Sequence, residues 1–141
     1  MKKKFDYVIT FDADGEHDVK SLNKINYFLK KNTNVDLLIG KRSFFNRFSE
    51  KIISLLFNFR FGIQDPLSGL KAYKTIELKK IITFIKHDYF LTDIIYIFNK
   101  HKKKIKNIDI QSIKVKQRKS KIGSFYANLK ILRSINFFLK P

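Results

Sequence analysis

The chain of 141 residues contains no cysteine, only two prolines and no long apolar stretch. Without cysteine, neither a disulfide framework nor a thiolate metal site can form. The longest stretches without a charged side chain, such as residues 52–59, have eight residues, whereas a membrane-spanning helix needs about 20 apolar residues. The basic residues 1–4 are followed by no apolar stretch of the kind a secretory signal needs. We therefore expect a reducing, cytoplasmic location.

Acidic residues are also scarce, with 12 against 30 basic ones, so the formal net charge is +18. Such an excess attracts polyanions, namely nucleic acid, an anionic membrane surface or phosphorylated substrates. An alternative is compositional drift, because only five of the basic residues are Arg and an AT-rich genome would supply such a Lys-rich chain. The length, with 44% hydrophobic and 15% aromatic residues, predicts one folded domain over residues 1–141.

Short β-rich segments alternate with amphipathic ones along the chain. We predict strands at residues 5–11, 35–39, 71–74 and 105–115, and helices at residues 19–31, 46–60, 77–85, 91–101 and 124–139. This alternation predicts an α/β fold with a mixed sheet flanked by helices. The first strand is short and apolar, so we interpret it as a central, buried strand of that sheet.

Two of the predicted helices carry continuous apolar stripes. In the helix over residues 46–60, helical periodicity places Phe48, Ile52, Leu55, Leu56 and Phe59 on one face, and Gly62 ends the helix. In the helix over residues 124–139, the stripe holds Phe125, Leu129, Leu132, Ile135 and Leu139. Lys130, Arg133 and Lys140 flank that second stripe, which either contacts an anionic membrane surface or packs on the sheet as core.

Four acidic side chains, Asp12, Asp14, Glu16 and Asp18, follow the first predicted strand within seven residues. Ligands of open α/β sheets bind beyond the carboxyl ends of strands. Carboxylates this close repel one another unless a cation neutralises them, and oxygen ligands suit Mg²⁺ or Mn²⁺. The alternative is a solvated turn in which Asp18 caps the next helix, which fits Asp18 best.

The segment Val8-Ile-Thr-Phe-Asp-Ala-Asp-Gly-Glu-His-Asp18 resembles the Asp-X-Asp region of family 2 glycosyltransferases, in particular the polyprenyl-phosphate (dolichyl-phosphate mannosyltransferase-like) subgroup. Three further blocks follow in the family's order. Ile39-Gly-Lys-Arg42 resembles its Gly-Ser-Arg, and Asp65-Pro-Leu-Ser-Gly-Leu-Lys-Ala-Tyr73 resembles its Asp-X-X-Ser-Gly-Phe-Arg-Ala block. Arg118-Lys-Ser-Lys121 resembles a shortened form of its last basic block, so the likeness spans roughly residues 5–135.

The resemblance implies a partial GT-A (Rossmann-like) fold and metal-dependent transfer of a sugar from a nucleotide-sugar to a polyprenyl phosphate. It implies that Mg²⁺ or Mn²⁺ is held by Asp12, Asp14 and Glu16, and that the donor diphosphate is bound by Arg118 and Lys121. It further implies that the acceptor is bound by Arg42, Arg47, Asp65 and Ser68, and that the catalytic acidic residue is Asp93. Such an enzyme would lie on the inner face of the membrane, against anionic lipid.

The family also has an N-terminal nucleotide-binding part, with a Pro-X-Tyr-Asn-Glu-like turn, that this sequence lacks. We therefore expect the 141 residues to need a separate chain that supplies this half, or to be a non-catalytic remnant. A basic nucleic-acid-binding module is a further alternative. It is disfavoured because the charge is diffuse and because no helix-turn-helix, zinc or RNP-like motif is present.

Overall fold

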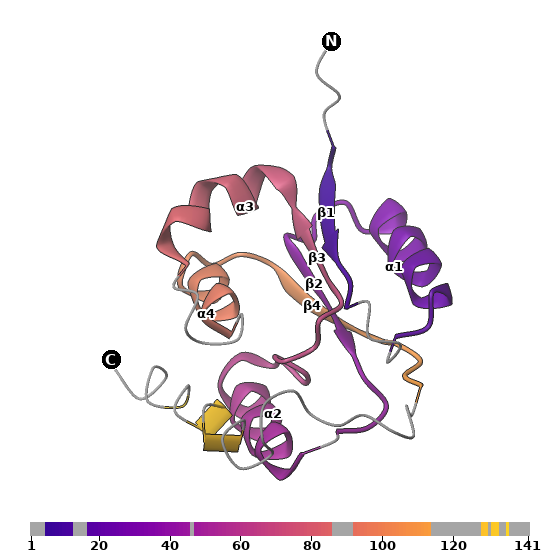
Figure 1. Ribbon diagram of the computed structural model, residues 1–141. Coiled ribbons are helices and arrows are strands. Elements are labelled where there is room, and N and C mark those ends of the chain that lie inside the picture. Colours follow the sequence, from indigo (N-terminus) through magenta and orange to yellow (C-terminus); the bar gives the residue numbers. More distant parts are fainter. Residues whose placement is uncertain are drawn as a thin grey trace.

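The described residues form a four-stranded mixed sheet flanked by helices, the α/β fold that the alternation predicted, and this arrangement is consistent with a partial Rossmann-like fold (Figure 1). The computed structural model describes residues 5–12, 17–45, 47–85, 92–113, 128–129, 131–132 and 135. Its elements are β1 (Tyr7–Thr10), α1 (Lys20–Lys31), β2 (Leu37–Lys41), α2 (Phe48–Phe61), β3 (Lys71–Lys74), α3 (Thr75–Ile81), the 3₁₀ turn η1 (Ile82–Phe84), α4 (Thr92–Lys100) and β4 (Ile105–Asp109).

The described strands lie in the order β1-β3-β2-β4. β3 runs antiparallel to both β1 and β2, and β2 runs parallel to β4. The first strand, which was expected to be central and buried, lies at the edge of the sheet that the structure describes, since β1 pairs with β3 on one side and Val8 and Ile9 are exposed. An apolar strand sequence predicts burial, but it does not say whether a second strand lies alongside.

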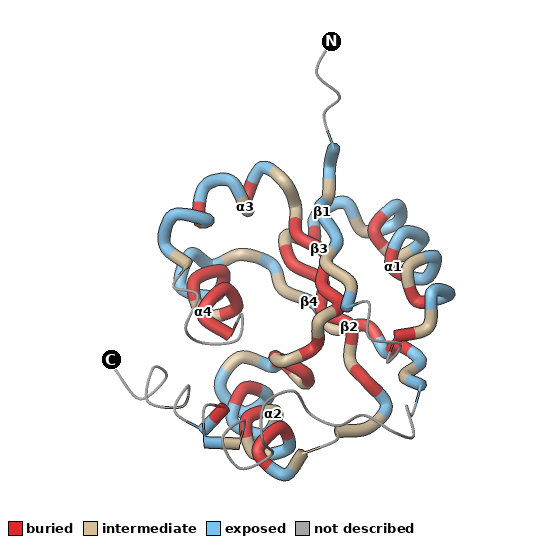
Figure 2. The backbone as a smooth tube through the Cα atoms, viewed as in Figure 1, coloured by how far each residue is buried: buried red, intermediate tan, exposed pale blue. Residues whose placement is uncertain are grey.

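Two hydrophobic cores lie on the two faces of the sheet. α1 covers one face with Ile25 and Leu29, whereas α2, α3 and α4 cover the other (Figures 1 and 2). The Asp18 Oδ1 atom accepts a hydrogen bond of 2.9 Å from the Lys20 backbone N–H, which confirms the predicted cap of the first helix.

The apolar stripe of α2 exists as predicted, but it points away from the sheet. Phe48, Leu55 and Phe59 are 76%, 71% and 93% exposed, while Ile53 and Phe57 are buried against the sheet. Because the helix is apolar around most of its circumference, periodicity could not tell which face would be buried. Gly62 ends the helix at a φ of 69°, a left-handed conformation that glycine adopts without strain.

The predicted stripe of the last helix is only partly supported within the described part of residues 124–139. Leu129 and Leu132 are more than a third exposed, and Ile135 is half-buried. The buried residue is Ile131, which joins the core of Ile53 and Phe57. The side of this segment that packs on the core therefore centres on Ile131 and not on the predicted Leu129 and Leu132. Phe125 and Leu139 of the predicted stripe lie outside the described residues.

Within the described part of the chain, none of the helices has the length and apolar character to cross a bilayer.

Candidate functional site

The end of β1 and the loop before β3 meet at one end of the sheet. In the β1–β3 pairing Thr10 lies opposite Lys71, and the Thr10 hydroxyl donates a 2.9 Å hydrogen bond to the Gly69 carbonyl. Two residues further on, the exposed Asp12 carboxylate lies directly against Gly69, so that a Cβ atom at position 69 would overlap it. The absent side chain of Gly69 therefore makes the space that the Asp12 carboxylate fills.

Arg42 and Asp65 form a buried bidentate ion pair at the same end of the sheet. The Arg42 Nε and Nη2 atoms donate to Asp65 Oδ2 and Oδ1 at 2.8 and 3.1 Å, and the Arg42 backbone N–H also donates to Oδ2 at 3.1 Å. Asp65 is fully buried and Arg42 nearly so. Both were predicted to contact the acceptor. In the folded chain they contact each other and join the end of β2 to the loop that holds Gly69.

Glu50, in the first turn of α2, extends this ion pair into a network. Its Oε2 atom lies 3.3 Å from Arg42 Nη2, and its Oε1 atom lies 3.3 Å from Arg47 Nη1. Glu50 is buried, whereas the Arg47 side chain is about a third exposed, at 32%. Of the two arginines predicted for the acceptor, Arg47 therefore has the guanidinium that solvent reaches more easily.

Lys71 is a fully buried cation in the middle of the predicted site residues. It is paired with Thr10 on β1 and with Ile39 on β2, and its ammonium group donates to the Ser68 carbonyl. Burial lowers the pKa of Lys71 to about 8, although the nearby Asp65 and Asp12 carboxylates act in the opposite direction. Lys71 was not among the predicted site residues, although it occupies the position of the Arg in the Ser-Gly-Phe-Arg block that this segment resembles.

Asp93, predicted as the catalytic residue, lies buried in the first turn of α4. Its Oδ1 atom accepts a 2.8 Å hydrogen bond from the Ile94 backbone N–H. The Asp93 carboxylate is close enough to act on both Lys71 and Tyr73. Burial raises the pKa of Tyr73 to about 12, and the Asp93 and Asp12 carboxylates act in the same direction. Asp93 therefore acts electrostatically on Lys71 and Tyr73, the two buried side chains on which Asp12 also acts.

Ser68 is buried and shapes the loop before β3 as a tight turn. Its N–H donates to the Asp65 carbonyl at 3.3 Å, and its hydroxyl accepts from the Leu70 N–H, also at 3.3 Å. Gly40 allows the end of β2 to approach this loop, since a Cβ there would lie 3.1 Å from the Leu70 carbonyl oxygen and 2.9 Å from Ile110 Cδ1. The turn explains Ser68 structurally, and its acceptor role stays a prediction.

The metal prediction rests largely on residues outside the described ranges. Asp14 and Glu16, like Arg118 and Lys121 of the predicted donor site, belong to that undescribed part. Among the residues that the structure does describe, no three acidic or histidine side chains gather as a metal-holding group. Asp12 is thus the one predicted ligand whose surroundings are known, and its exposed carboxylate is the oxygen donor that Mg²⁺ or Mn²⁺ accepts.

No family model matches the sequence. The chain is 28% identical to a protein of Methanocaldococcus jannaschii named "Uncharacterized protein MJ1222", in an alignment that includes 89% of this chain and 57% of the relative. The chain therefore spans little more than half the length of that relative.

Proposed function

We propose that the chain is the metal- and acceptor-binding part of a GT-A glycosyltransferase that moves a sugar from a nucleotide-sugar to a polyprenyl phosphate. The observation that carries this proposal is the convergence of Asp12, Arg42, Asp65, Lys71 and Asp93 at one end of the sheet. Three of the four sequence blocks that resemble the family supply Asp12, Arg42, Asp65 and Lys71, whereas Asp93 lies outside these blocks. Separate blocks that meet in space are what a shared binding site requires.

The proposed metal site is built on Asp12, with Asp14 and Glu16 as further oxygen ligands. A bound Mg²⁺ or Mn²⁺ would stabilise the leaving diphosphate of the donor. The described part fits such an ion, because the Asp12 carboxylate is exposed and is held against Gly69 rather than in an ion pair with a surface lysine. Lys71 lies behind it and partly balances the carboxylate cluster from inside.

In this proposal, the acceptor phosphate binds to the arginine side chains of the site. A phosphate is already ionised near neutral pH, so the reaction needs positioning and charge stabilisation more than a strong base. We assign the direct contact to Arg47, whose side chain is partly exposed, and the closure over the donor diphosphate to Arg118 and Lys121. Arg42, Asp65 and Ser68 hold the loop that positions Gly69 and Asp12.

The same proposal places the chain peripherally on the inner face of a membrane, where its net charge of +18 attracts anionic lipid. Its other half would be a nucleotide-binding part. The chain spans 57% of its relative's length, and the proposal places that half either on a longer polypeptide or on a separate chain. A non-catalytic remnant is the alternative.

Divalent-ion binding is the first test. Mn²⁺ is titrated by calorimetry into the chain, alone and with a nucleoside diphosphate, for the wild type, Asp12→Asn and Gly69→Ala. Because a Cβ at position 69 displaces the Asp12 carboxylate, Gly69→Ala should weaken Mn²⁺ binding by roughly tenfold or more. Asp6→Asn is the matched control, since Asp6 is exposed and precedes β1 at the other end of the strand. Equal affinity in all four proteins contradicts the metal site.

Transfer itself is the second test. Sugar transfer from a panel of nucleotide-sugars to polyprenyl phosphate is measured with and without a nucleotide-binding half added as a fusion or in trans. We expect transfer only with the added half, and we expect Arg47→Ala to reduce it. Metal binding with no transfer in either condition would favour the remnant.

A further inference from the structure

We propose that the outward face of α2, formed by Phe48, Leu55, Leu56 and Phe59, is a membrane-contact surface for anionic lipid. This inference deepens the peripheral association proposed above and rests on it, while its test needs no transferase activity. Phe59 is 93% exposed, and Phe48 and Leu55 are each more than 70% exposed. Single exposed apolar residues are ordinary, but four on one helical face form a patch that marks a contact surface.

The charges of α2 favour a lipid headgroup layer over other partners. At 100° per residue, Lys51 lies on one side of the apolar stripe and Arg60 on the other, and both are exposed. The one acidic residue of α2, Glu50, is buried and paired with Arg42 and Arg47. The outer face of the helix therefore carries apolar and cationic side chains without an anion, the pattern of helices that lie in the interface of anionic bilayers.

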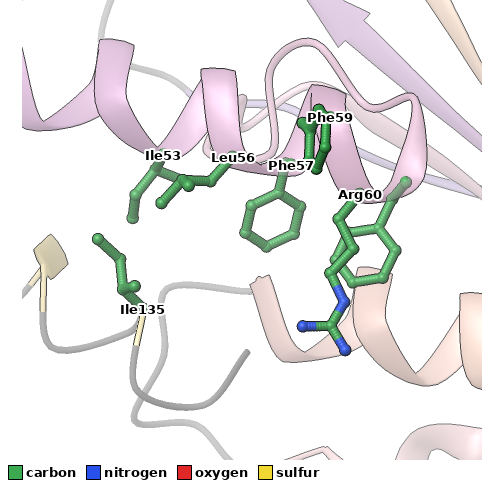
Figure 3. A pocket seen from close by; sticks show the side chains of 7 residues that line it. Ile53, Leu56, Phe57, Phe59, Arg60 and Ile135 are labelled. Carbon is green, nitrogen blue, oxygen red and sulfur yellow. The ribbon is translucent and has the colours of Figure 1, made fainter. Parts of the chain in front are cut away.

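A cavity continues the apolar surface inward. It has a volume of about 230 Å³ and lies between α2 and Ile135, which points toward Ile53 across it (Figure 3). Leu56 and Phe59 belong both to the exposed stripe and to the lining of this cavity, while Arg60 adds a guanidinium group to the same lining. The apolar surface of α2 thus extends from the exposed stripe into the cavity, and the Arg60 guanidinium lies beside it.

A second copy of the chain is a poorer occupant of this face. Each copy carries a net charge of +18, so two copies repel each other, whereas an anionic bilayer attracts every copy. The location also agrees with the proposed acceptor. α2 follows β2 at the end of the sheet where Arg42 and Asp65 pair, and its first turn contributes Glu50 to that network.

The sequence contains no tryptophan, so one introduced indole reports on one position. Phe59→Trp and Phe84→Trp are mixed with vesicles of phosphatidylcholine and phosphatidylglycerol in equal parts, and with vesicles of phosphatidylcholine alone, at low salt. Phe84 is 60% exposed in η1, which follows α3, and α3 and α2 lie at opposite ends of the same sheet face (Figure 1). We expect the emission of Trp at position 59 to move to shorter wavelength with the anionic vesicles, and that of Trp at position 84 to stay unchanged.

Co-sedimentation with the same vesicles gives the strength of the contact. Leu55→Ser/Phe59→Ser should lower the partition coefficient by roughly a hundredfold, because two large apolar side chains no longer enter the interface. Ile76→Ser/Phe84→Ser is the matched control and should leave the coefficient unchanged, since Ile76 and Phe84 are similarly exposed on α3 and η1. All four substitutions are at exposed positions, so the variants should fold.

Each outcome decides a specific point. Binding to anionic vesicles that is insensitive to Leu55→Ser/Phe59→Ser overturns the α2 surface and leaves peripheral association standing. No binding at low salt overturns both, without bearing on Mn²⁺ binding at Asp12. A lipid-free chain that is dimeric, and that becomes monomeric on Leu55→Ser/Phe59→Ser, would assign the face to a second copy instead.

Discussion

The interior beside β3 and the outward face of α2 reverse the usual distribution of side chains. Around β3 the chain buries ionisable groups, among them Asp65, Lys71 and Asp93, each at most 1% exposed. On α2 it exposes large apolar groups, up to Phe59 at 93%. Charged residues are rarely buried without partners, and large apolar patches are rarely left bare. Both arrangements cost stability, and such departures are expected where a chain binds something.

α1 shows that the same chain follows the usual rule elsewhere. It buries Ile25 and Leu29 and directs lysines outward, four of them within Lys20–Lys31. Its exposed surface is therefore more cationic than that of α2, which has Lys51 and Arg60, and Tyr27 is its one large exposed hydrophobic side chain. If charge alone drew the protein to anionic lipid, α1 would serve as well as α2, so the Phe59 experiments separate the two contributions.

The largest expected effect is that of breaking the buried ion pair. Arg42→Met leaves the Asp65 carboxylate buried without its ion-pair partner and leaves Glu50 paired with Arg47 alone, so it should lower the free energy of unfolding by about 3–5 kcal/mol. Urea denaturation measures this loss. Adding Asp65→Leu to the variant should recover part of the stability. A loss below about 1 kcal/mol would mean that the pair is not buried in solution.

The next effect is a pH dependence caused by Lys71. Its pKa is about 8 in the folded chain and 10.5 as an unperturbed group, so between these values the unfolded chain binds more protons. The free energy of unfolding should therefore rise with pH, by roughly 2 kcal/mol from pH 8 to pH 10. Tyr73 opposes this trend only above pH 10, since its pKa is raised from 10.0 to about 12.

The control for this prediction is Lys71→Met, compared with the wild type at each pH. The difference in unfolding free energy between the two proteins isolates the contribution of Lys71 from that of the surface lysines. A difference that stays constant from pH 8 to pH 10 would show that Lys71 reaches solvent in the folded chain.

The smallest expected effect lies on α2. Phe59→Ser should change the free energy of unfolding by less than about 0.5 kcal/mol, because the side chain contacts mainly solvent. Phe57→Ala, two residues away on the buried face, is the contrast and should cost about 3–5 kcal/mol. Thermal or urea unfolding measures both, and equal costs would show that Phe59 is covered in solution.

Local signals were enough to predict the elements and some of their ends. Asp18 at the start of α1 and Gly62 at the end of α2 were recognisable because capping depends on neighbouring residues alone. The buried face of α2 was not, because Ile53 and Phe57 differ from Leu55 and Phe59 only in what lies opposite them. The edge position of β1 and the burial of Lys71 depend on pairing between distant segments, which one sequence does not reveal.

The site was predictable as a set of residues but not as an arrangement. Arg42 and Asp65 were both assigned to the acceptor because the sequence blocks that contain them resemble blocks of the family, and nothing in the sequence indicated that they bind each other. In the sequence, Gly69 is one residue of the Asp65–Tyr73 block. Only the folded chain shows that the Asp12 carboxylate fills the space that a side chain at position 69 would occupy.

The network of Glu50, Arg42 and Asp65 connects α2 to the site. Glu50 in the first turn of α2 pairs with Arg42, Arg42 pairs with Asp65, and Asp65 precedes the loop whose Gly69 lies against Asp12. If lipid binding at α2 changes Mn²⁺ binding at Asp12, linkage requires the change to be the same factor in both directions. Anionic vesicles should alter the Mn²⁺ affinity of the chain by the factor by which Mn²⁺ alters its partition onto vesicles, and Glu50→Gln should bring both factors close to one.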